Sequence, residues 1–456
     1  MTRVHRFALL ALVLVLGACG ADAPAPTSGA DTPSLAPASV ASALPSAPIV
    51  GEPEPAPGSD STVYEPNPAA IVVAIDPGHG GCLDWGVPDP SERGVEWSEK
   101  QLTLDIGLRL RDLLEAEGIT VVMTRDADMA LAGDDYPDLG CTGPAWRDVN
   151  GDGESGFDPE GHTRTRDELQ ARLDLANLAR ADALVSIHIN SPFDAGQSIA
   201  VAFTQTYYTD ETPWGATATA DLAADVQSGV VDALDEIAAY ERGDRGTTAH
   251  NFYIVAPPLY EATEERPNPW AQPTRGGLMP VILSEVGSIT LRDEHDLLAS
   301  DEGQAAVAEG ILQGLRAWFG QRALAARIGL ADEAVGATPE AVAGDGPPFW
   351  ATVVDPATPL RLRLTNTGTD AWPAGTALVA GWEPSDAPYL RQAPEALDTL
   401  EVEVPSLEPG ASVELEVVLP PVPAGGRALA WISLSDGLAT FADFGSPALQ
   451  VSTTRP

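Results

Sequence analysis

Residues 71–81, Ile-Val-Val-Ala-Ile-Asp-Pro-Gly-His-Gly-Gly, form a hydrophobic run that ends on a histidine among glycines. Two later runs have the same form, Ala-Leu-Val-Ser-Ile-His-Ile-Asn at 183–190 and Val-Ile-Leu-Ser-Glu-Val-Gly at 281–287. A short apolar run bounded by turn residues is typical of a buried β-strand. In open α/β sheets, ligands bind at the carboxyl ends of the strands. We therefore expect the polar residues that end these runs to meet at one edge of a sheet.

Between residues 70 and 320, short apolar runs alternate with longer stretches of helical periodicity. The predicted strands are 71–75, 119–123, 183–187, 200–203, 252–255 and 280–284. The predicted helices are 99–116, 166–180, 216–240 and 302–319. This alternation predicts an α/β domain at 69–322, with a mostly parallel sheet flanked by helices. For its first helix, Ser98 and Gln101 predict an N-terminal capping box.

After residue 340 the pattern changes to short strands separated by Pro and Gly turns. Residues 361–365 and 413–419 alternate between polar and apolar side chains, and 428–434 is a further strand. This spacing predicts a small all-β sandwich at 340–456. Its Asn-Thr-Gly-Thr-Asp-Ala-Trp segment, ending at Trp372, resembles a turn of immunoglobulin-like accessory modules, and we expect Trp372 to pack in the core.

The chain is long and strongly acidic. Its 456 residues allow two or three domains. With 25 Lys and Arg against 67 Asp and Glu, its formal net charge is −42. Nucleic acid is therefore not expected as a partner, because phosphate binding needs clustered basic residues. No protein partner can be inferred from the sequence.

The N-terminus has the form of an export signal at residues 1–19. Arg3 and Arg6 precede an apolar run, and Leu-Gly-Ala-Cys ends at Cys19. This ending resembles a bacterial lipobox, which implies a lipid-modified Cys19 and a membrane-anchored lipoprotein of the cell envelope. Gly20 in place of Asp favours the outer membrane or periplasm in a two-membraned cell. A plain signal peptide with an incidental cysteine is the alternative.

The segment 20–68 is rich in Pro, Ala and Ser and has no apolar periodicity. Such a composition predicts a disordered linker that holds the folded part away from the membrane. Among later segments, none has the roughly 20 apolar residues that a membrane span needs.

Two sites of possible covalent or ionic stabilisation precede residue 160. Cys82 and Cys141 are an even pair in an exported protein, so they could form a disulfide or remain free. Asp148, Asn150 and Asp152 have the spacing of the first ligands in a calcium-binding loop of the Asp-x-Asn-x-Asp-Gly type. The twelfth position of that loop is Pro rather than Glu, so an acidic Gly-rich turn is the alternative.

The strand ends suggest a catalytic zinc site. Such a site takes three protein ligands, usually His and Asp or Glu, and leaves one position for water. His79 and His188 are two candidates. On chemistry alone, Glu92, Glu96 and Glu99 are all possible third ligands, since each lies in or just after the loop that follows His79.

Glu285 is a candidate for the group that moves the proton. It ends an apolar strand, and partial burial should raise the pKa of its carboxyl, as a proton shuttle requires. A helix cap or a salt-bridge partner is the alternative role for this residue.

Five motifs together resemble one family. They are Ile-Asp-Pro-Gly-His79-Gly-Gly, Glu99-Lys-x-Leu-Thr-Leu-Asp-Ile, Val-Val-Met-Thr-Arg125, Ser-Ile-His188-Ile-Asn190-Ser and Leu-Ser-Glu285-Val-Gly. In this order, over about 70–320, they are similar to zinc-dependent N-acetylmuramoyl-L-alanine amidases of the Amidase_3 type. The resemblance implies a six-stranded sheet, and one Zn²⁺ held by His79, Glu99 and His188. It also implies that Glu285 is the catalytic acid and base, and that the bond cleaved joins the muramic lactyl group of peptidoglycan to L-alanine.

Several features depart from the family pattern. Ser288 and Ile289 follow the Glu-Val-Gly motif, and insertions at 126–165 and 256–279 should reshape the substrate groove. Arg125 could bind a peptide carboxylate of the substrate or form a structural ion pair. Asn190 could orient the loop after the second histidine through its side chain.

Two other functions remain open from the sequence. The chain could be a non-catalytic cell-wall-binding lipoprotein that keeps the fold for recognition. It could also be an exported zinc hydrolase that acts on a different amide. Metal content would separate the first of these from an amidase, and product analysis the second.

Overall fold

The computed structural model describes residues 68–81, 84–132, 148–150, 162–191, 193–194, 197–198, 201–212, 215–257, 275–337, 351–387, 389–395, 400–422 and 427–453. The predicted export signal, residues 20–67 of the predicted linker, and Cys19, Cys82, Cys141 and Asp152 lie outside these ranges. Among the described helices, none is long and apolar enough to cross a membrane.

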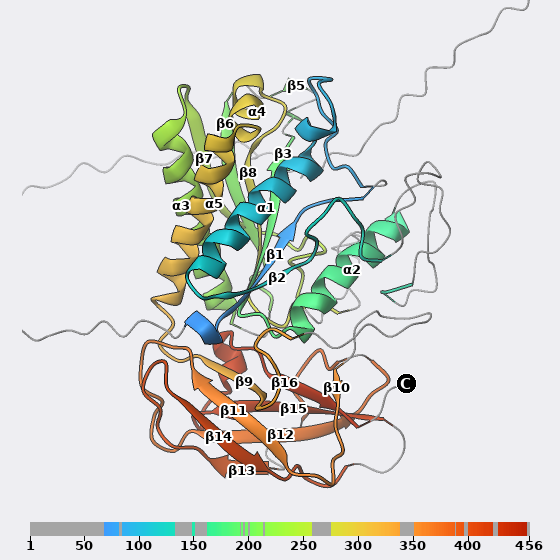
Figure 1. Ribbon diagram of the computed structural model, residues 1–456, viewed down its shortest axis with the longest axis vertical. Coiled ribbons are helices and arrows are strands. Elements are labelled where there is room, and N and C mark those ends of the chain that lie inside the picture. The colour runs from blue at the N-terminus through green and yellow to red at the C-terminus, as the bar shows by residue number, and fades with distance from the viewer. Residues whose placement is uncertain are drawn as a thin grey trace, which may run out of the picture. The chain divides into compact units, whose positions relative to one another are not determined.

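A six-stranded sheet forms the centre of the N-terminal part (Figure 1). Its strand order is β2-β1-β3-β8-β6-β7. All neighbouring strands are parallel except β6 and β8, which are antiparallel. The strands are β1 (Val72–Pro77), β2 (Thr120–Met123), β3 (Ala183–Asn190), β6 (Ala202–Tyr208), β7 (Arg242–Ala249) and β8 (Val281–Ser288), and β4 (Phe193–Asp194) pairs separately with β5 (Gln197–Ser198).

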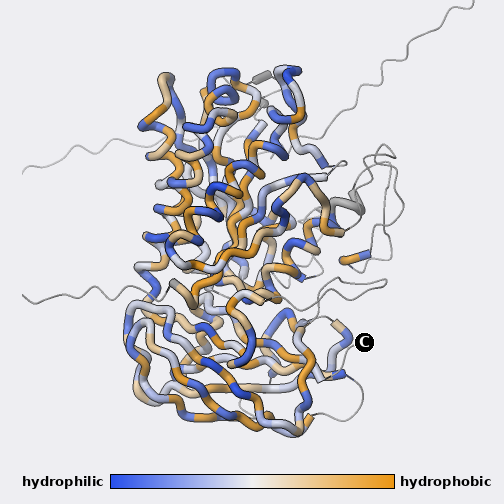
Figure 2. The backbone as a smooth tube through the Cα atoms, in the orientation of Figure 1, coloured by the Kyte–Doolittle hydropathy of each residue, from blue (hydrophilic) through white to orange (hydrophobic). Residues whose placement is uncertain are grey.

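Helices cover both faces of this sheet, as the sequence predicted. They are α1 (Glu99–Ala116), α2 (His162–Leu178), α3 (Ala216–Ile237), α4 (Arg292–Leu298) and α5 (Asp301–Phe319), with short 3₁₀ turns η1 (Pro68–Ala70) and η2 (Val95–Trp97). Alternate side chains of β1 point to opposite faces. Val73 and Ile75 pack in one core with α1, α3 and α5. Val72 and Ala74 pack in a second core with α2. Figure 2 shows the resulting concentration of hydrophobic residues along the central strands.

One predicted strand is wrong, and one observed strand was not predicted. Residues 252–255 form a turn, and Tyr253, Ile254 and Val255 are buried against the α2 side of the sheet without joining it. The edge strand is instead β7, whose sequence is Arg-Gly-Asp-Arg-Gly-Thr-Thr-Ala. An edge strand is half solvated, so it needs no hydrophobic run, and periodicity could not reveal it.

The capping box predicted for α1 is also wrong. Ser98 is the N-cap residue, but its hydroxyl donates to the carbonyl of Val95 (2.5 Å) and makes no cap hydrogen bond. The Gln101 side chain donates to Asp105 (2.8 Å) one turn further along the helix.

The C-terminal part forms two further sheets that enclose a common core. One has the order β10-β16-β15-β12-β13 and the other β14-β11-β9. Their strands are β9 (Ala326–Leu330), β10 (Thr352–Val353), β11 (Leu360–Asn366), β12 (Ala377–Pro384), β13 (Leu400–Glu403), β14 (Ser412–Val417), β15 (Ala428–Ser435) and β16 (Leu449–Ser452), with a 3₁₀ turn η4 (Phe441–Phe444). Strand β9 lies before residue 340, where the sequence places the start of this domain. Trp372 is 1% exposed, and its indole N–H donates to the carbonyl of Ala325 (3.2 Å).

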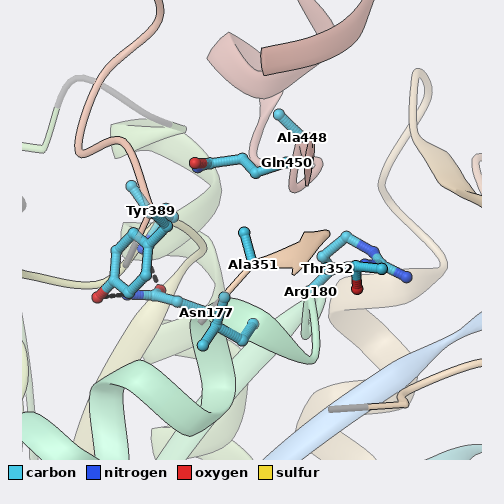
Figure 3. A pocket seen from close by; sticks show the side chains of 9 residues that line it. Asn177, Arg180, Ala351, Thr352, Tyr389, Ala448 and Gln450 are labelled. Atoms are coloured by element: carbon cyan, nitrogen blue, oxygen red, sulfur yellow. Dashed lines mark hydrogen bonds between the residues drawn. The ribbon is translucent and has the colours of Figure 1, made fainter. Parts of the chain in front are cut away.

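Tyr389 of the C-terminal part forms hydrogen bonds with side chains of helix α2. Its hydroxyl donates to Asp174 Oδ1 (2.7 Å) and accepts from the amide nitrogen of Asn177 (2.7 Å). Figure 3 shows Tyr389 and Asn177 in the wall of a cavity, which Ala351, Thr352 and other C-terminal residues also line. None of the residues that end β1, β3 and β8 lines this cavity, so it is separate from the group at the sheet edge.

Replacing Tyr389 by Phe tests the strength of this contact. The variant removes one hydrogen-bond partner from two buried polar side chains, so the free energy of unfolding should fall by about 1–3 kcal/mol. Urea denaturation of the full chain would measure it. Tyr208→Phe is the control, because the half-buried Tyr208 makes no side-chain hydrogen bond within the described part of the chain. Equal changes in both variants would contradict a specific role of the Tyr389 hydroxyl.

Candidate metal centre

His79 leaves the end of β1 through a tight turn. Its backbone has a φ of 63°, in the left-handed region that non-glycine residues rarely adopt. The preceding residue must be glycine for a different reason, since a Cβ at Gly78 would lie 2.4 Å from Nε2 of His188. The Gly-rich sequence therefore allows the first strand end to approach the side chain of the second histidine closely.

Two histidines and a glutamate gather at the carboxyl ends of the strands. Glu99 Oε1 lies 3.2 Å from His79 Nε2 and 3.4 Å from His188 Nδ1. One ligand atom from each side chain falls within 4.8 Å of the other two. These three residues could therefore hold one metal ion. The other two candidates, Glu92 and Glu96, are exposed in the loop before α1 and do not join the group.

Backbone amides orient the carboxylate of Glu99. Its Oε2 accepts from the N–H of Val87 (2.8 Å), and its Oε1 accepts from the N–H of Ile189 (3.0 Å). Burial acts to raise the pKa of Glu99, but the charge of His79 and hydrogen bonds from both histidines outweigh it and hold that pKa well below its usual value. The carboxylate is thus ionised and positioned, as a metal ligand must be.

Asp84 sets the tautomer of His79. Its Oδ1 lies 2.8 Å from His79 Nδ1. A carboxylate can only accept, so Nδ1 must carry the proton and Nε2 is left to face Glu99. Burial acts to lower the pKa of His79, but the charges of Glu99 and Asp84 raise it well above its usual value. A proton and a metal cation therefore compete for this imidazole.

A buried ion pair holds the turn that carries His79. Arg172 of α2 donates to Asp76 Oδ1 (2.8 Å) at the end of β1, and to the main-chain carbonyls of Pro77 (2.9 Å) and His79 (2.7 Å). Asp76 also accepts from the hydroxyls of Thr124 and Ser186 (2.6 Å each). Neither Asp84 nor Arg172 was predicted from the sequence. The one signal for the latter was an arginine on the otherwise buried face of a helix.

Glu285 lies next to His188 across the sheet. Strands β3 and β8 pair so that these two residues are opposite each other. The Oε2 atom of Glu285 is buried, and it has no hydrogen-bond partner among the residues that the structure describes. Burial, and then the negative charge of Glu99, raise the pKa of Glu285 to about 8. This carboxyl can therefore hold a proton near neutral pH.

Arg125 is buried beside the end of β1, where it contacts the main chain around His79. Its side chain is 2% exposed, and its guanidinium donates to the main-chain carbonyls of Pro77 (2.8 Å), Gly78 (3.0 Å) and Lys100 (2.6 Å). These contacts favour the structural alternative for Arg125. Asn190 is half-buried at the end of β3. Its main-chain carbonyl accepts a hydrogen bond from the N–H of Ile289 (2.9 Å).

The segment predicted to bind calcium is described only in part. The main-chain N–H groups of Val149 and Asn150 donate to Asp167 Oδ1 (2.7 and 3.1 Å). Arg275 donates to the carbonyl of Val149 (2.7 Å). Asp152 lies outside the described residues, so the calcium loop stays a prediction.

Histidines and a carboxylate that meet at the carboxyl ends of a mostly parallel sheet are typical of α/β enzymes that bind a metal ion at this edge. The family model for N-acetylmuramoyl-L-alanine amidase, Amidase_3, matches residues 73–317. The chain therefore belongs to this family, and the resemblance drawn from the five motifs is confirmed.

Known relatives carry the same description. The chain is 31% identical over 120 residues to the germination-specific N-acetylmuramoyl-L-alanine amidase of Bacillus subtilis (strain 168), over 26% of this chain and 39% of that protein. It is 27% identical over 252 residues to the sporulation-specific amidase of the same organism, over 55% of this chain and 68% of that protein. The solved structure of AmiC2 of Nostoc punctiforme is 27% identical, with 54% of this chain and 95% of that chain covered and a TM-score of 0.35. The chain thus spans less than half the length of the first relative.

The close approach at Gly78 gives a test of the metal centre. Gly78→Ala should displace the His188 imidazole, because the added Cβ would overlap its ring. Metal affinity should fall by about 10- to 100-fold, as for other changes that misplace a ligand. Metal content after dialysis against a buffered chelator would measure it. Gly329→Ala is the control, since its Cβ would meet only Arg180 Nη2 at 3.8 Å. Undiminished metal binding in Gly78→Ala would contradict the assignment of His188 as a ligand.

Proposed function

We propose that this protein is a zinc-dependent N-acetylmuramoyl-L-alanine amidase that hydrolyses peptidoglycan. The observation that carries the proposal is Glu285, which lies beside the group of His79, Glu99 and His188 and whose buried Oε2 has no hydrogen-bond partner in the described part of the chain. A buried carboxyl oxygen without a hydrogen bond destabilises the fold. Such a residue is therefore not expected in a protein that only binds the wall. Membership of the family supports the same reaction.

The ligand set suits zinc. Two histidines and one carboxylate are a common catalytic zinc set that leaves one coordination position open. In the described residues, the carboxylate lies between the two imidazoles and is ionised. When bound, Zn²⁺ would polarise the scissile carbonyl and lower the pKa of a water molecule.

The chain's own residues would supply the proton transfer and the positioning. Glu285 would take a proton from the attacking water and deliver it to the alanine nitrogen as the amide bond breaks. Its raised pKa suits a group that must both accept and release a proton near neutrality. Asp84 would keep His79 in one tautomer throughout, and Arg172 would keep the turn at His79 in place.

We also propose where the protein acts. The sequence of residues 1–19, with its lipobox-like ending at Cys19, supports export and anchoring of the protein to a membrane of the cell envelope. The linker at 20–68 would let the enzyme reach the wall from that anchor. A disulfide between Cys82 and Cys141, calcium at Asp148, Asn150 and Asp152, and an immunoglobulin-like C-terminal domain remain part of the proposal.

Glu285→Gln separates catalysis from metal binding. The amide keeps the shape of the side chain but cannot accept the proton, so turnover should fall by at least about 100-fold. Metal content should stay at about one ion per chain, since three other residues bind it. The control is Glu302→Gln, because Glu302 is exposed in the first turn of α5. Normal turnover in Glu285→Gln would refute its role.

Mass spectrometry of digested peptidoglycan tests the proposed reaction. The protein should release stem peptides with a free N-terminal L-alanine, and a zinc chelator should abolish the release because the ligand set would be empty. Re-addition of Zn²⁺ should restore it. Zinc-loaded protein that releases nothing would favour a different amide substrate. Protein with neither zinc nor activity would favour the non-catalytic wall-binding function.

A further inference from the structure

Trp85 stands beside the metal centre without being buried. Both of its chain neighbours are close to the centre. Asp84 accepts from His79 Nδ1 (2.8 Å), and a Cβ at Gly86 would lie 2.4 Å from Glu99 Oε2. The backbone of Trp85 is therefore held close to the metal ligands from both sides. Even so, 37% of the residue is exposed to solvent.

A buried lysine holds the indole ring. Lys100 Nζ lies 3.9 Å from the centroid of the Trp85 ring, a distance at which a cation attracts the face of an indole. Lys100 is itself 2% exposed, and its ammonium donates to the carbonyl of Gly81 (2.8 Å) and to Asp128 (2.7 Å). The indole is thus packed on an anchored ammonium, and the part of the residue that stays exposed can contact a ligand.

We propose that the exposed surface of Trp85 is the platform on which the muramic sugar ring of the substrate stacks. The inference rests on the proposed function and specifies how that site selects its substrate. In that substrate only the lactyl group separates the sugar ring from the scissile amide, so the sugar must lie close to the metal ligands. Trp85 occupies such a position, next to the partner of His79.

The chemistry around the indole favours a sugar over the peptide. A pyranose ring presents an apolar C–H face to a flat aromatic ring and needs no charged partner. The nearby carboxylates of Asp84 and Asp128 can accept hydrogen bonds from sugar hydroxyls. Trp85 is therefore a positioning residue that sets the preference for amides attached to glycan.

Two substrates test this role. One is a disaccharide muropeptide, and the other is a lactyl-L-alanyl peptide that lacks the sugar ring. Trp85→Ala should raise KM for the muropeptide about tenfold, with kcat within about twofold, because binding is lost without loss of chemistry. The kinetics of the lactyl peptide should not change. Trp85→Phe keeps an aromatic ring and should lose less than Trp85→Ala.

Phe444→Ala is the matched control, because Phe444 is 38% exposed in the C-terminal part, and its KM for both substrates should equal that of the wild type. Metal content is measured for every variant. An unchanged KM of Trp85→Ala for the muropeptide would overturn the platform. Equal losses on both substrates, or lower metal content, would also overturn it and show that the indole only supports the loop. If the wild type cleaves neither substrate, the proposed function itself fails.

Discussion

The metal centre depends on the buried pair of Arg172 and Asp76. Asp76 is 0% exposed, and burial alone would raise the pKa of its carboxyl. The charge of Arg172 and three side-chain hydrogen bonds outweigh burial and keep that pKa below its usual value. A buried charge without its partner costs about 3–5 kcal/mol, so neither residue can be lost alone. Because the same guanidinium holds the carbonyl of His79, the pair converts a β-strand end into a fixed ligand position.

This arrangement also explains why a strained backbone persists at His79. A non-glycine residue in the left-handed region raises the free energy of the fold by about 1–3 kcal/mol, and it persists only where the surrounding contacts hold it there. Here Arg172 holds the carbonyl of His79, Asp84 holds its ring, and Gly80 donates its N–H to the carbonyl of Asp84 (2.8 Å). The site is therefore preorganised by contacts that need no metal, and the ligands need little rearrangement to bind one.

The sequence revealed the strands that carry chemistry because parallel strands buried on both faces consist of nearly continuous hydrophobic residues. Strands β1, β3 and β8 have this form, and His79, His188 and Glu285 follow from it. The third candidate ligand could not be identified from a hydrophobic strand. Chemistry left Glu92, Glu96 and Glu99 equivalent, and only the family resemblance selected Glu99, since the geometry of the loop before α1 cannot be read from composition.

Other features were beyond sequence reasoning for identifiable reasons. Strand β7 is polar because it lies at the sheet edge, and residues 252–255 are apolar because they pack on the sheet without pairing. Two roles for Arg125 stayed open from the sequence because a strand-end arginine can point toward solvent or fold back onto carbonyls, and only the three-dimensional path of residues 77–100 distinguishes the two. The contacts of Arg172 with Asp76 and His79 could not be predicted for the same reason, since they join residues far apart in the sequence.

The contact of Tyr389 with α2 has a consequence for how this protein can evolve. The helix that carries Arg172 also presents Asp174 and Asn177 to the C-terminal part, only one turn away. Arg322 and Arg327 add ion pairs to the buried Asp182, which lies just before β3. An unrelated C-terminal module grafted onto the amidase domain would remove one hydrogen-bond or ion-pair partner from each of these buried polar groups. The two parts are therefore expected to have been inherited together, with substitutions at Tyr389 matched by substitutions on α2.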